Sequence, residues 1–238
     1  MDVRESQMDA DRFGFSIAKA APSSPTEVAD LDVWASERGI RMAIIRVPTN
    51  DLSIVHALEE RGARLTDAIV TFTRPLGPDE EFKSDARIRT LQAGDLVPIL
   101  DIAKRCYAGY QSHYHADPRL DSETCDEVYV SWARRCCEPG SAADEMLVAE
   151  DDGEVVGFFS VKSHGATGEG VLSGVDPRYR SRGLYHAFMQ AAMASLRNAG
   201  VEEMHVSTQI WNSTVQRAWT RQGFLPATST LTFHLWFE

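Results

Sequence analysis

The chain has 238 residues, of which 43% are hydrophobic and 25% are charged, and its formal net charge is -11. These values are typical of a folded globular protein and differ from those of a disordered chain. The acidic balance disfavours nucleic acid or an anionic membrane as a partner, because both bind a basic face. The amino end, MDVRESQMDADRFG, lacks the apolar segment of a secretory signal, and no run approaches the roughly 18 apolar residues of a membrane span. We therefore expect a cytoplasmic protein.

The cysteines are even in number but do not form a recognisable metal or disulfide pattern. Their spacings match no zinc motif, and a chain of this length does not need disulfides to fold. We expect reduced and mostly buried thiols at Cys106, Cys125, Cys136 and Cys137.

The polar segment 76–85 is expected to be a linker, because it carries Pro78 and a run of acidic residues. Hydrophobic periodicity before it predicts a helix over 31–39, a strand over 40–48, a helix over 50–62 and a strand over 67–74. Residues 1–75 are therefore expected to form an N-terminal α/β half-domain.

Residues 86–238 carry a longer mixed pattern of helices and strands. Two strands, at 145–151 and 154–164, are expected to form a hairpin across Asp152 and Gly153. The other predicted strands lie at 87–92, 168–175, 201–209 and 229–237, and the predicted helices lie at 94–110, 122–136, 183–200 and 213–223. The fold class is mixed α/β.

A weak internal repeat relates the two parts of the chain. A shift of 161 positions without gaps brings Gly39 onto Gly200 and Gly62 onto Gly223, and it superimposes helix, strand, helix and strand. Identities are few, so shared architecture and coincidence both remain open. The shifted copy of the arginine-rich loop falls on KAAP from Lys19, which has neither the glycine nor the arginines. Only the C-terminal part is expected to hold an anion.

The segment DPRYRSRGLYHAF, residues 176–188, concentrates positive charge in this acidic chain. It joins a predicted strand to a helix through Gly183, and the first amides of a helix are unpaired donors that favour an anion. Arginines near such amides add charge-assisted hydrogen bonds of about 1.5 to 3 kcal/mol each. The segment therefore predicts a diphosphate site, although a basic turn that caps a helix or contacts another protein would show the same residues.

Two motifs together resemble the GCN5-related N-acetyltransferases (GNAT). VDPRYRSRGLY is similar to the pyrophosphate loop R-x-x-G-x-G/A of that family, and NSTVQRAWTRQGF is similar to its closing helix. The resemblance covers 86–238 and implies a GNAT fold, a mostly antiparallel sheet flanked by helices, preceded by a smaller degenerate half. Within the superfamily the chain resembles most the N-acetyltransferases of TDP-4-amino-4,6-dideoxy sugars, through DADRFGFSIA, VYVSW and STQIWN.

The resemblance implies acetyl-CoA as cofactor and assigns residues to it. The pantetheine arm would lie against the strand at Ser173, Gly174 and Val175, and Asn212 would line the channel while also capping its helix. The pyrophosphate would be held by Arg180, Ser181, Arg182, Gly183, Leu184 and Tyr185, and Trp219 would lie beside the cofactor.

One departure from the family bears on mechanism. The family pattern has a tyrosine able to protonate the leaving thiolate where this chain has Trp219, and an indole is not a useful acid at neutral pH. Another group or water could donate the proton, the thiolate could leave unprotonated, or the protein could bind acyl-CoA without turnover. The oxyanion would need an amide near Gly174 or Val175.

The acceptor side is expected at the loop YQSHYHADP. Tyr110, His113, Tyr114 and His115 are candidate substrate contacts there, and His113 and His115 are candidate bases, with Glu169 as a further one. Ordinary loop packing is the alternative. A His-x-His metal pair lacks a convincing third ligand, so no metal is expected.

The sequence therefore predicts an acetyl-CoA-dependent N-acetyltransferase acting on a small-molecule amine. A nucleotide-linked amino sugar is the first candidate acceptor, and Arg119, Arg134 and Arg135 are the clustered cations that could meet its phosphates. A cationic amine such as an aminoglycoside or polyamine, or a non-catalytic acyl-CoA-binding module, are the alternatives. A homodimer is compatible with each of them.

Overall fold

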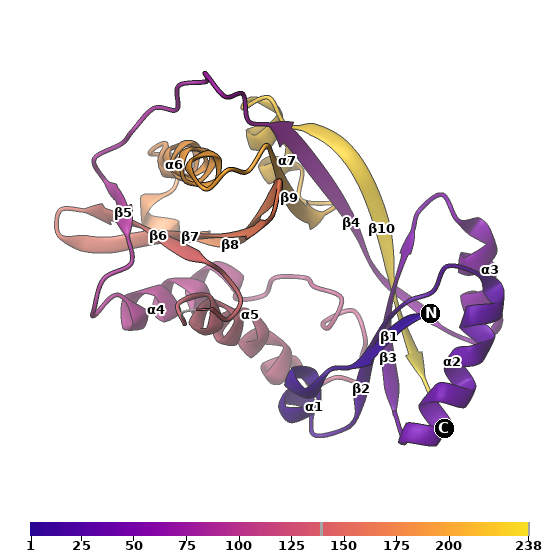
Figure 1. The fold of residues 1–238 in the computed structure, drawn as a ribbon. Coiled ribbons are helices and arrows are strands. Elements are labelled where there is room, and N and C mark those ends of the chain that lie inside the picture. The colour runs from indigo at the N-terminus through magenta and orange to yellow at the C-terminus, as the bar shows by residue number, and fades with distance from the viewer. Residues whose placement is uncertain (139, 238) are drawn as a thin grey trace.

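The computed structural model describes residues 1–138 and 140–237. They form one ten-stranded sheet in the order β1-β2-β3-β10-β4-β9-β8-β7-β6-β5 (Figure 1). Neighbouring strands are antiparallel except in the pairs β2–β3 and β8–β9. The strands are β1 (Asp2–Glu5), β2 (Ile17–Ala21), β3 (Met42–Pro48), β4 (Arg64–Pro75), β5 (Ile88–Thr90), β6 (Glu145–Asp151), β7 (Glu154–His164), β8 (Thr167–Val175), β9 (Glu203–Gln209) and β10 (Leu225–Trp236).

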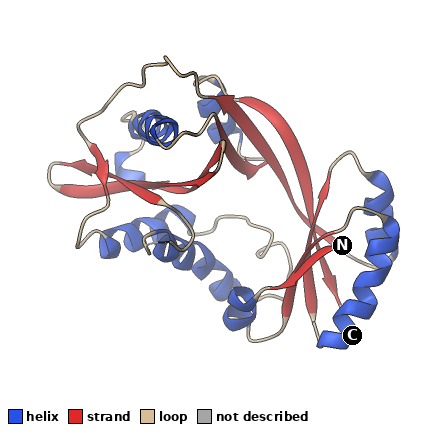
Figure 2. Ribbon diagram, in the orientation of Figure 1, coloured by secondary structure: helices blue, strands red, loops and turns tan. Residues whose placement is uncertain are grey.

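Helices cover both faces of this sheet (Figure 2). One face packs against α1, α4 and α5, whose buried side chains form a core with Ile17, Met42 and Phe158 of the strands. The opposite face packs against α2 and α3 in the N-terminal part and against α6 and α7 in the C-terminal part. The helices are α1 (Gln7–Phe13), α2 (Pro25–Arg38), α3 (Leu52–Glu60), α4 (Leu96–Tyr107), α5 (Ser122–Cys136), α6 (Leu184–Asn198) and α7 (Ser213–Thr220).

The observed elements confirm the predicted mixed α/β class. The hairpin turns at Asp152 and Gly153, and α5 covers the predicted range 122–136. The sequence missed β1, α1 and β2, because segments of four to seven residues are too short to give a clear period. The four cysteines are free, with Cys125 and Cys136 buried and the other two partly exposed.

The predicted repeat is visible in the element boundaries. Strand β3 begins at Met42 and β9 at Glu203, which are 161 positions apart. Helices α3 and α7, and strands β4 and β10, begin with the same offset. The two parts of the chain therefore share a β-α-β architecture.

The segment 76–85 has no helix or strand, as expected of a linker. It is held near the sheet, because the amide of Leu76 donates to the carbonyl of Glu202 and Arg74 pairs with Glu80. Strand β10 lies between β3 and β4, so residues on both sides of this segment build one continuous sheet. The domain boundaries at 75 and 86 remain predictions.

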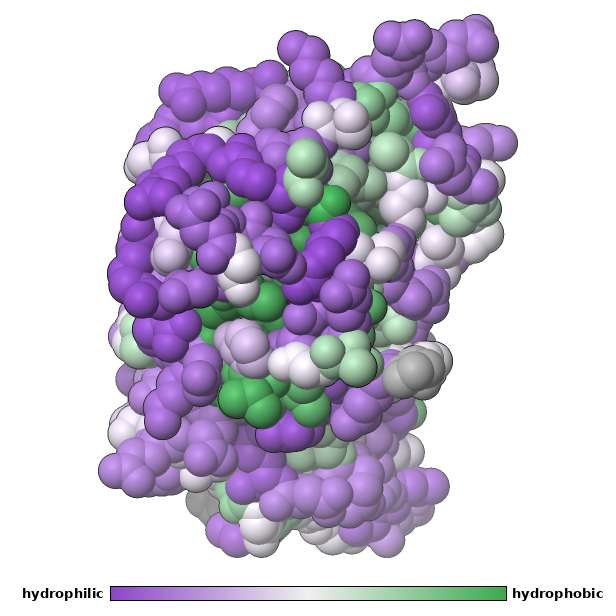
Figure 3. Space-filling model, turned by 90° about the vertical axis from the view of Figure 1, so that its left-hand side faces the viewer, coloured by the Kyte–Doolittle hydropathy of each residue, from purple (hydrophilic) through white to green (hydrophobic). Residues whose placement is uncertain are grey.

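The far edge of the sheet ends in β5, which has only three residues. A short edge strand offers few free backbone groups for pairing with another chain. This side of the molecule is mostly hydrophilic in Figure 3, and hydrophobic side chains are visible mainly in its hollowed parts.

Candidate functional site

Strands β8 and β9 run parallel and then separate. They are paired from Thr167 to Gly170 of β8 and from Glu203 to Val206 of β9, whereas both strands continue beyond the pairing. A register shift opposite Ser160 and Val161 lies at the point where the pairing ends. From there to Val175, β8 is hydrogen-bonded to β7 alone among the described strands. We call this opening between β8 and β9 the splay.

The far end of α4 closes one side of the splay. Tyr107 donates from its hydroxyl to the carbonyl of Ser173 (2.7 Å), and Cys106 donates from Sγ to the carbonyl of Val175 (3.2 Å). A Cβ on Gly174 would come within 2.8 Å of Phe158, so glycine is required there for packing. The three residues predicted to meet the cofactor thus lie together on the unpaired part of β8.

The loop after β8 is fixed by a buried carboxylate. Asp176 accepts hydrogen bonds from Arg105 (2.8 Å) and from Arg178 through its amide and its guanidinium. The guanidinium of Arg178 lowers the pKa of Asp176 to about 2, against the opposing effect of burial. Because Arg178 is committed to this carboxylate, its role is to hold the loop.

The start of α6 presents open backbone donors. Ser181 and Gly183 both have left-handed backbone, with φ of 64° and 77°, and a Cβ on Gly183 would meet nothing within 4 Å. No side chain caps α6. Within the described residues, the amides from 181 to 186 have no hydrogen-bond acceptor. Such a helix start fits the diphosphate of acetyl-CoA.

Of the three loop arginines, one is left available. Arg182 pairs with Asp151 (3.2 Å) and lies over the ring of Tyr179 (4.8 Å), and Arg178 is committed to Asp176. Arg180 has no ion pair with any described residue. The charge of the loop is therefore partly structural, and Arg180 is the arginine that can meet an anion.

Tyr185 and Trp219 meet beside the splay. The indole Nε1 of Trp219 donates to the hydroxyl of Tyr185 (2.7 Å). Burial raises the pKa of Tyr185 to about 12, and hydrogen bonds with Trp219 and Ser173 act in the opposite direction. Because an indole can only donate, Tyr185 accepts with a lone pair and its own proton stays available.

An aromatic cluster stands at the mouth of the splay on the α4–α5 side. Tyr107 stacks on Tyr129 with ring centroids 4.1 Å apart, and Tyr110 lies edge-on to both. The side chain of Trp211 is about half exposed, and its ring centroid lies 5.3 Å from that of Tyr110. Tyr110 thus lies in this aromatic cluster, and its contact with an acceptor stays a prediction.

The sequence did not identify Asp67, which lies behind this cluster. Tyr110 donates to Oε1 of Gln209, and Nε2 of Gln209 donates to Asp67 (3.3 Å). Burial raises the pKa of Asp67, although the hydrogen bonds from Gln209 and the Ala68 amide oppose this. The available signal was a single acidic residue at the head of the strand-forming segment DAIVTF.

His113 belongs to a buried relay. Asp117 is ionised, because hydrogen bonds from Trp236, the Arg119 amide and His234 outweigh burial and bring its pKa to about 2. His234 donates from Nδ1 to Asp117 (3.0 Å), and its Nε2 accepts from Nδ1 of His113 (2.9 Å). Burial lowers the pKa of His113 and of His234, so both rings are neutral. The relay therefore leaves Nε2 of His113 without a proton.

The other predicted side chains are placed less favourably for catalysis. Tyr114 donates to Asp9 (2.9 Å), and both ring nitrogens of His115 have partners, Ser112 and Asp126. Glu169 pairs with His164 at the closed end of β8, away from the splay. Asn212 does not cap α7 with its side chain, contrary to expectation; it donates to Thr208 (3.0 Å).

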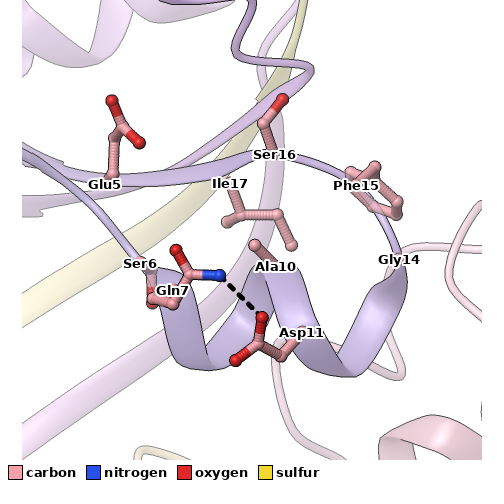
Figure 4. A pocket seen from close by; sticks show the side chains of 9 residues that line it. All are labelled: Glu5, Ser6, Gln7, Ala10, Asp11, Gly14, Phe15, Ser16 and Ile17. Carbon is pink, nitrogen blue, oxygen red and sulfur yellow. Dashed lines mark hydrogen bonds between the residues drawn. The ribbon is translucent and has the colours of Figure 1, made fainter.

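A hollow of about 320 Å³ lies beside α1 and does not coincide with this site (Figure 4). Two of its lining residues are Glu5 and Asp11, and Asp11 accepts from Gln7 (2.6 Å). Its carboxylates do not suit an anionic ligand. In the part of the chain that is described, no three His, Cys, Asp or Glu side chains gather as metal ligands. None of the described helices is long and apolar enough to span a membrane.

Comparison with known families decides the kind of site. The model of the acetyltransferase (GNAT) family matches residues 98–224, which is more than half of the chain. The chain belongs to the GNAT acetyltransferase family. Members of this family use acetyl-CoA as acetyl donor, and the matched range contains the splay, the α6 loop and α7.

Two curated relatives of this GNAT chain are similar over most of its length. SpsD of Bacillus subtilis, a spore coat polysaccharide biosynthesis protein, is 20% identical over 193 residues, covering 81% of this chain and 65% of that protein. The mycothiol acetyltransferase of Thermobispora bispora is 30% identical over 160 residues, covering 64% of this chain and 50% of that protein. The chain thus spans one half to two thirds of their lengths.

Solved structures support the fold. A GCN5-related N-acetyltransferase from Sphaerobacter thermophilus has a TM-score of 0.62 at 14% identity, covering 98% of this chain and 75% of that one. A tandem GNAT protein from the clavulanic acid biosynthesis pathway has a TM-score of 0.58 at 15% identity, covering 87% and 67%. The second likeness agrees with a GNAT domain preceded by a related α/β region.

Proposed function

We propose that this protein transfers an acetyl group from acetyl-CoA to the amine of a small molecule. The observation that carries the proposal is the open start of α6 beside the splay. The amides of Gly183 and Leu184 and the guanidinium of Arg180 would hold the diphosphate, and the strand at Ser173–Val175 would flank the pantetheine arm. Acetyl-CoA supplies the activated acetyl thioester when bound.

Asp67 is proposed as the group that receives the acceptor ammonium and its proton. Its raised pKa keeps it a better proton acceptor than an ordinary aspartate, while Gln209 fixes one carboxylate oxygen. Tyr110 and Trp211 form an apolar wall beside it. The acceptor ammonium must lose a proton before its nitrogen can attack the thioester. A carboxylate next to the mouth of the splay can accept that proton.

Tyr185 is proposed as the proton donor on the cofactor side. Its hydroxyl accepts from Trp219 and keeps its own proton, next to the unpaired part of β8. The hydrogen bond from Trp219 stabilises the phenolate and so offsets part of the burial effect that raises the pKa of Tyr185 to about 12. Tyr185 thus supplies the hydroxyl that position 219 lacks.

The acceptor class is proposed from chemistry and from the names of relatives. An amino sugar is the first candidate, since one relative is named for polysaccharide biosynthesis. The amino sugar could be linked to a nucleotide. Neither of the curated relatives reported above is named as a TDP-sugar acetyltransferase. A cationic amine such as a polyamine is the alternative that suits the net charge of -11.

Thiol release from acetyl-CoA with a panel of amines tests the proposal. Wild-type protein is expected to release CoA with at least one amino sugar, and Asp67→Asn to lower kcat about 100-fold with unchanged CoA affinity. Glu169→Gln, the matched removal of a carboxylate at the closed end of β8, is expected to leave kcat unchanged. Binding of acetyl-CoA without turnover of any amine would instead support a non-catalytic acyl-CoA-binding module.

A further inference from the structure

A second pocket lies on the sheet face under the α4–α5 loop. Its volume is about 280 Å³, and strands β1, β2 and β3 form its floor. We infer that this pocket binds an anionic oxygen group, a phosphate or a carboxylate, carried by the acceptor amine. That the bound molecule is the acceptor amine rests on the proposed function. That it carries an anionic group rests on the lining of the pocket itself. The lining residues used here are Arg4, Lys19, Arg46, Asp2, His113 and Tyr114.

Positive charge dominates the lining. Arg46 is exposed and has no ion pair with any described residue. Lys19 is held by the buried Asp9 (2.7 Å), which fixes the position of its ammonium. The one carboxylate of the lining, Asp2, is 3.9 Å from Arg4, and both side chains are largely exposed, so this pair is weak. In a chain of net charge -11, such a local excess of cations is a recognition feature.

Strand register connects this pocket to Asp67. Thr232 of β10 lies opposite Arg46 of β3 and opposite Asp67 of β4, so the three side chains share one face of the sheet. The hydroxyl of Thr232 is fully buried and has no hydrogen-bond partner among the described residues. Because Thr232 is fully buried, its hydroxyl offers no contact to a ligand, and the link to Asp67 rests on the shared face. An amine carried by a molecule whose anionic group is bound at Arg46 would lie on the same face of the sheet as Asp67, with β10 between the two strands.

The histidine relay adds a directional contact. Asp117 and His234 fix the tautomer of His113, whose unprotonated Nε2 can accept a hydrogen bond at the edge of the same pocket. An acceptor next to cations, of which Lys19 is held in place by Asp9, suits a hydroxyl that neighbours an anionic group, as in a sugar phosphate or sugar acid. The volume is near the lower limit of small-molecule pockets, which favours a single anionic group over a whole nucleotide.

Titration calorimetry with inorganic phosphate, without acetyl-CoA, tests the pocket alone. Wild-type protein is expected to bind phosphate, and Arg46→Gln to weaken that binding about 10- to 100-fold, as expected for one lost charge-assisted bond. Arg38→Gln on the opposite face is the matched control and should leave it unchanged. Weakening by Arg180→Gln but not by Arg46→Gln would place the phosphate at α6 and overturn the inference. Acetate in place of phosphate distinguishes carboxylate from phosphate recognition.

Acetyl transfer supplies the second measurement. We expect kcat/KM to be at least tenfold higher for glucosamine 6-phosphate or muramic acid than for glucosamine, and Arg46→Gln to remove this preference through KM. Equal values for the charged and neutral amines would overturn the inference. Arg46-dependent phosphate binding with no turnover of any amine would keep the anion pocket and reject the proposed function.

Discussion

The two parts of the chain that match at a spacing of 161 residues differ at the start of one helix. In the N-terminal part, α2 is capped by Ser24, whose hydroxyl accepts from the amide of Glu27, and the carboxylate of Glu27 lies at the same end. In the C-terminal part, α6 begins at Gly183 with no side-chain cap. The first amides of α2 in the N-terminal copy thus have a side-chain acceptor, whereas those of α6 in the C-terminal copy do not.

The strands before these helices differ in the same sense. Strand β2 pairs with β3 from Ile17 to Ala20 and ends one residue later. Strand β8 continues for five residues past Gly170, where its pairing with β9 ends. An extended anionic ligand can use unpaired backbone at both elements, and among the described residues of the two copies the C-terminal one has it. We therefore propose that the cofactor binds where this copy leaves its hydrogen-bond donors open.

The largest effect is expected from closing the α6 loop. Gly183→Val places a β-branched side chain at φ 77° and fills the open space above the helix start, so CoA affinity should fall more than 100-fold in calorimetry. Gly39→Val is the matched control, because Gly39 has φ 61° and equally open space at the end of α2. It should cost stability but leave CoA affinity unchanged. Equal loss in both variants would show that strain alone, and not the loop, controls binding.

The next largest effect is expected from the hydroxyl of Tyr185. Tyr185→Phe removes the proposed proton donor while keeping the ring, so kcat should fall about 10- to 100-fold with CoA affinity retained. Because burial raises the pKa of Tyr185 to about 12, this phenol stays protonated wherever the reaction can be assayed.

The double variant Tyr185→Ala with Trp219→Tyr serves as the matched test of that role. It returns a phenol to position 219 and a small residue to position 185, as in the family pattern, and should recover much of the lost kcat. Failure of the pair to recover, with normal CoA binding, would argue that Tyr185 only fills space.

A buried contact between two histidines of the C-terminal part should make stability depend on pH. His113 of the α4–α5 loop and His234 of β10 are buried and neutral, with pKa values below the ordinary 6.5. Unfolding lets both rings take up protons below that pH, so the stabilisation is complete above about pH 6.5 and decreases as the pH falls further. We expect the free energy of unfolding to decrease by about 1 kcal/mol or more from pH 7 to pH 5.

Denaturant unfolding at several pH values measures this slope. His234→Gln should flatten it, whereas His56→Gln on α3 should not change it. A slope that is the same in all three proteins would mean that other groups cause the dependence.

The sequence was sufficient to predict the elements with a clear hydrophobic period and the glycine turn before α6, but it did not single out Asp67 or Arg46. Helix α5 and the hairpin follow from local pattern, and Gly183 followed from its place between a strand and a helix. Asp67 and Arg46 come from different strands and lie on one face of the sheet only through the order in which β3, β10 and β4 pair. Arg119, which the sequence grouped with Arg134 and Arg135 as a candidate for phosphate binding, instead pairs with Asp117 and lies over the ring of Trp236. Nearness in sequence was therefore a poor guide to charge at the site.

The smallest effect is expected at the cap that distinguishes the two helices. Ser24→Ala removes the hydrogen bond to the Glu27 amide and should lower the free energy of unfolding by about 1 kcal/mol. Ser36→Ala, an exposed serine on the same helix, should change it little. Neither variant should alter CoA affinity, because the start of α2 lacks the unpaired strand and the glycine turn that adjoin α6. If Ser24→Ala created a second CoA site, an open helix start alone would be sufficient for binding, and the splay would not be the feature that separates the two copies.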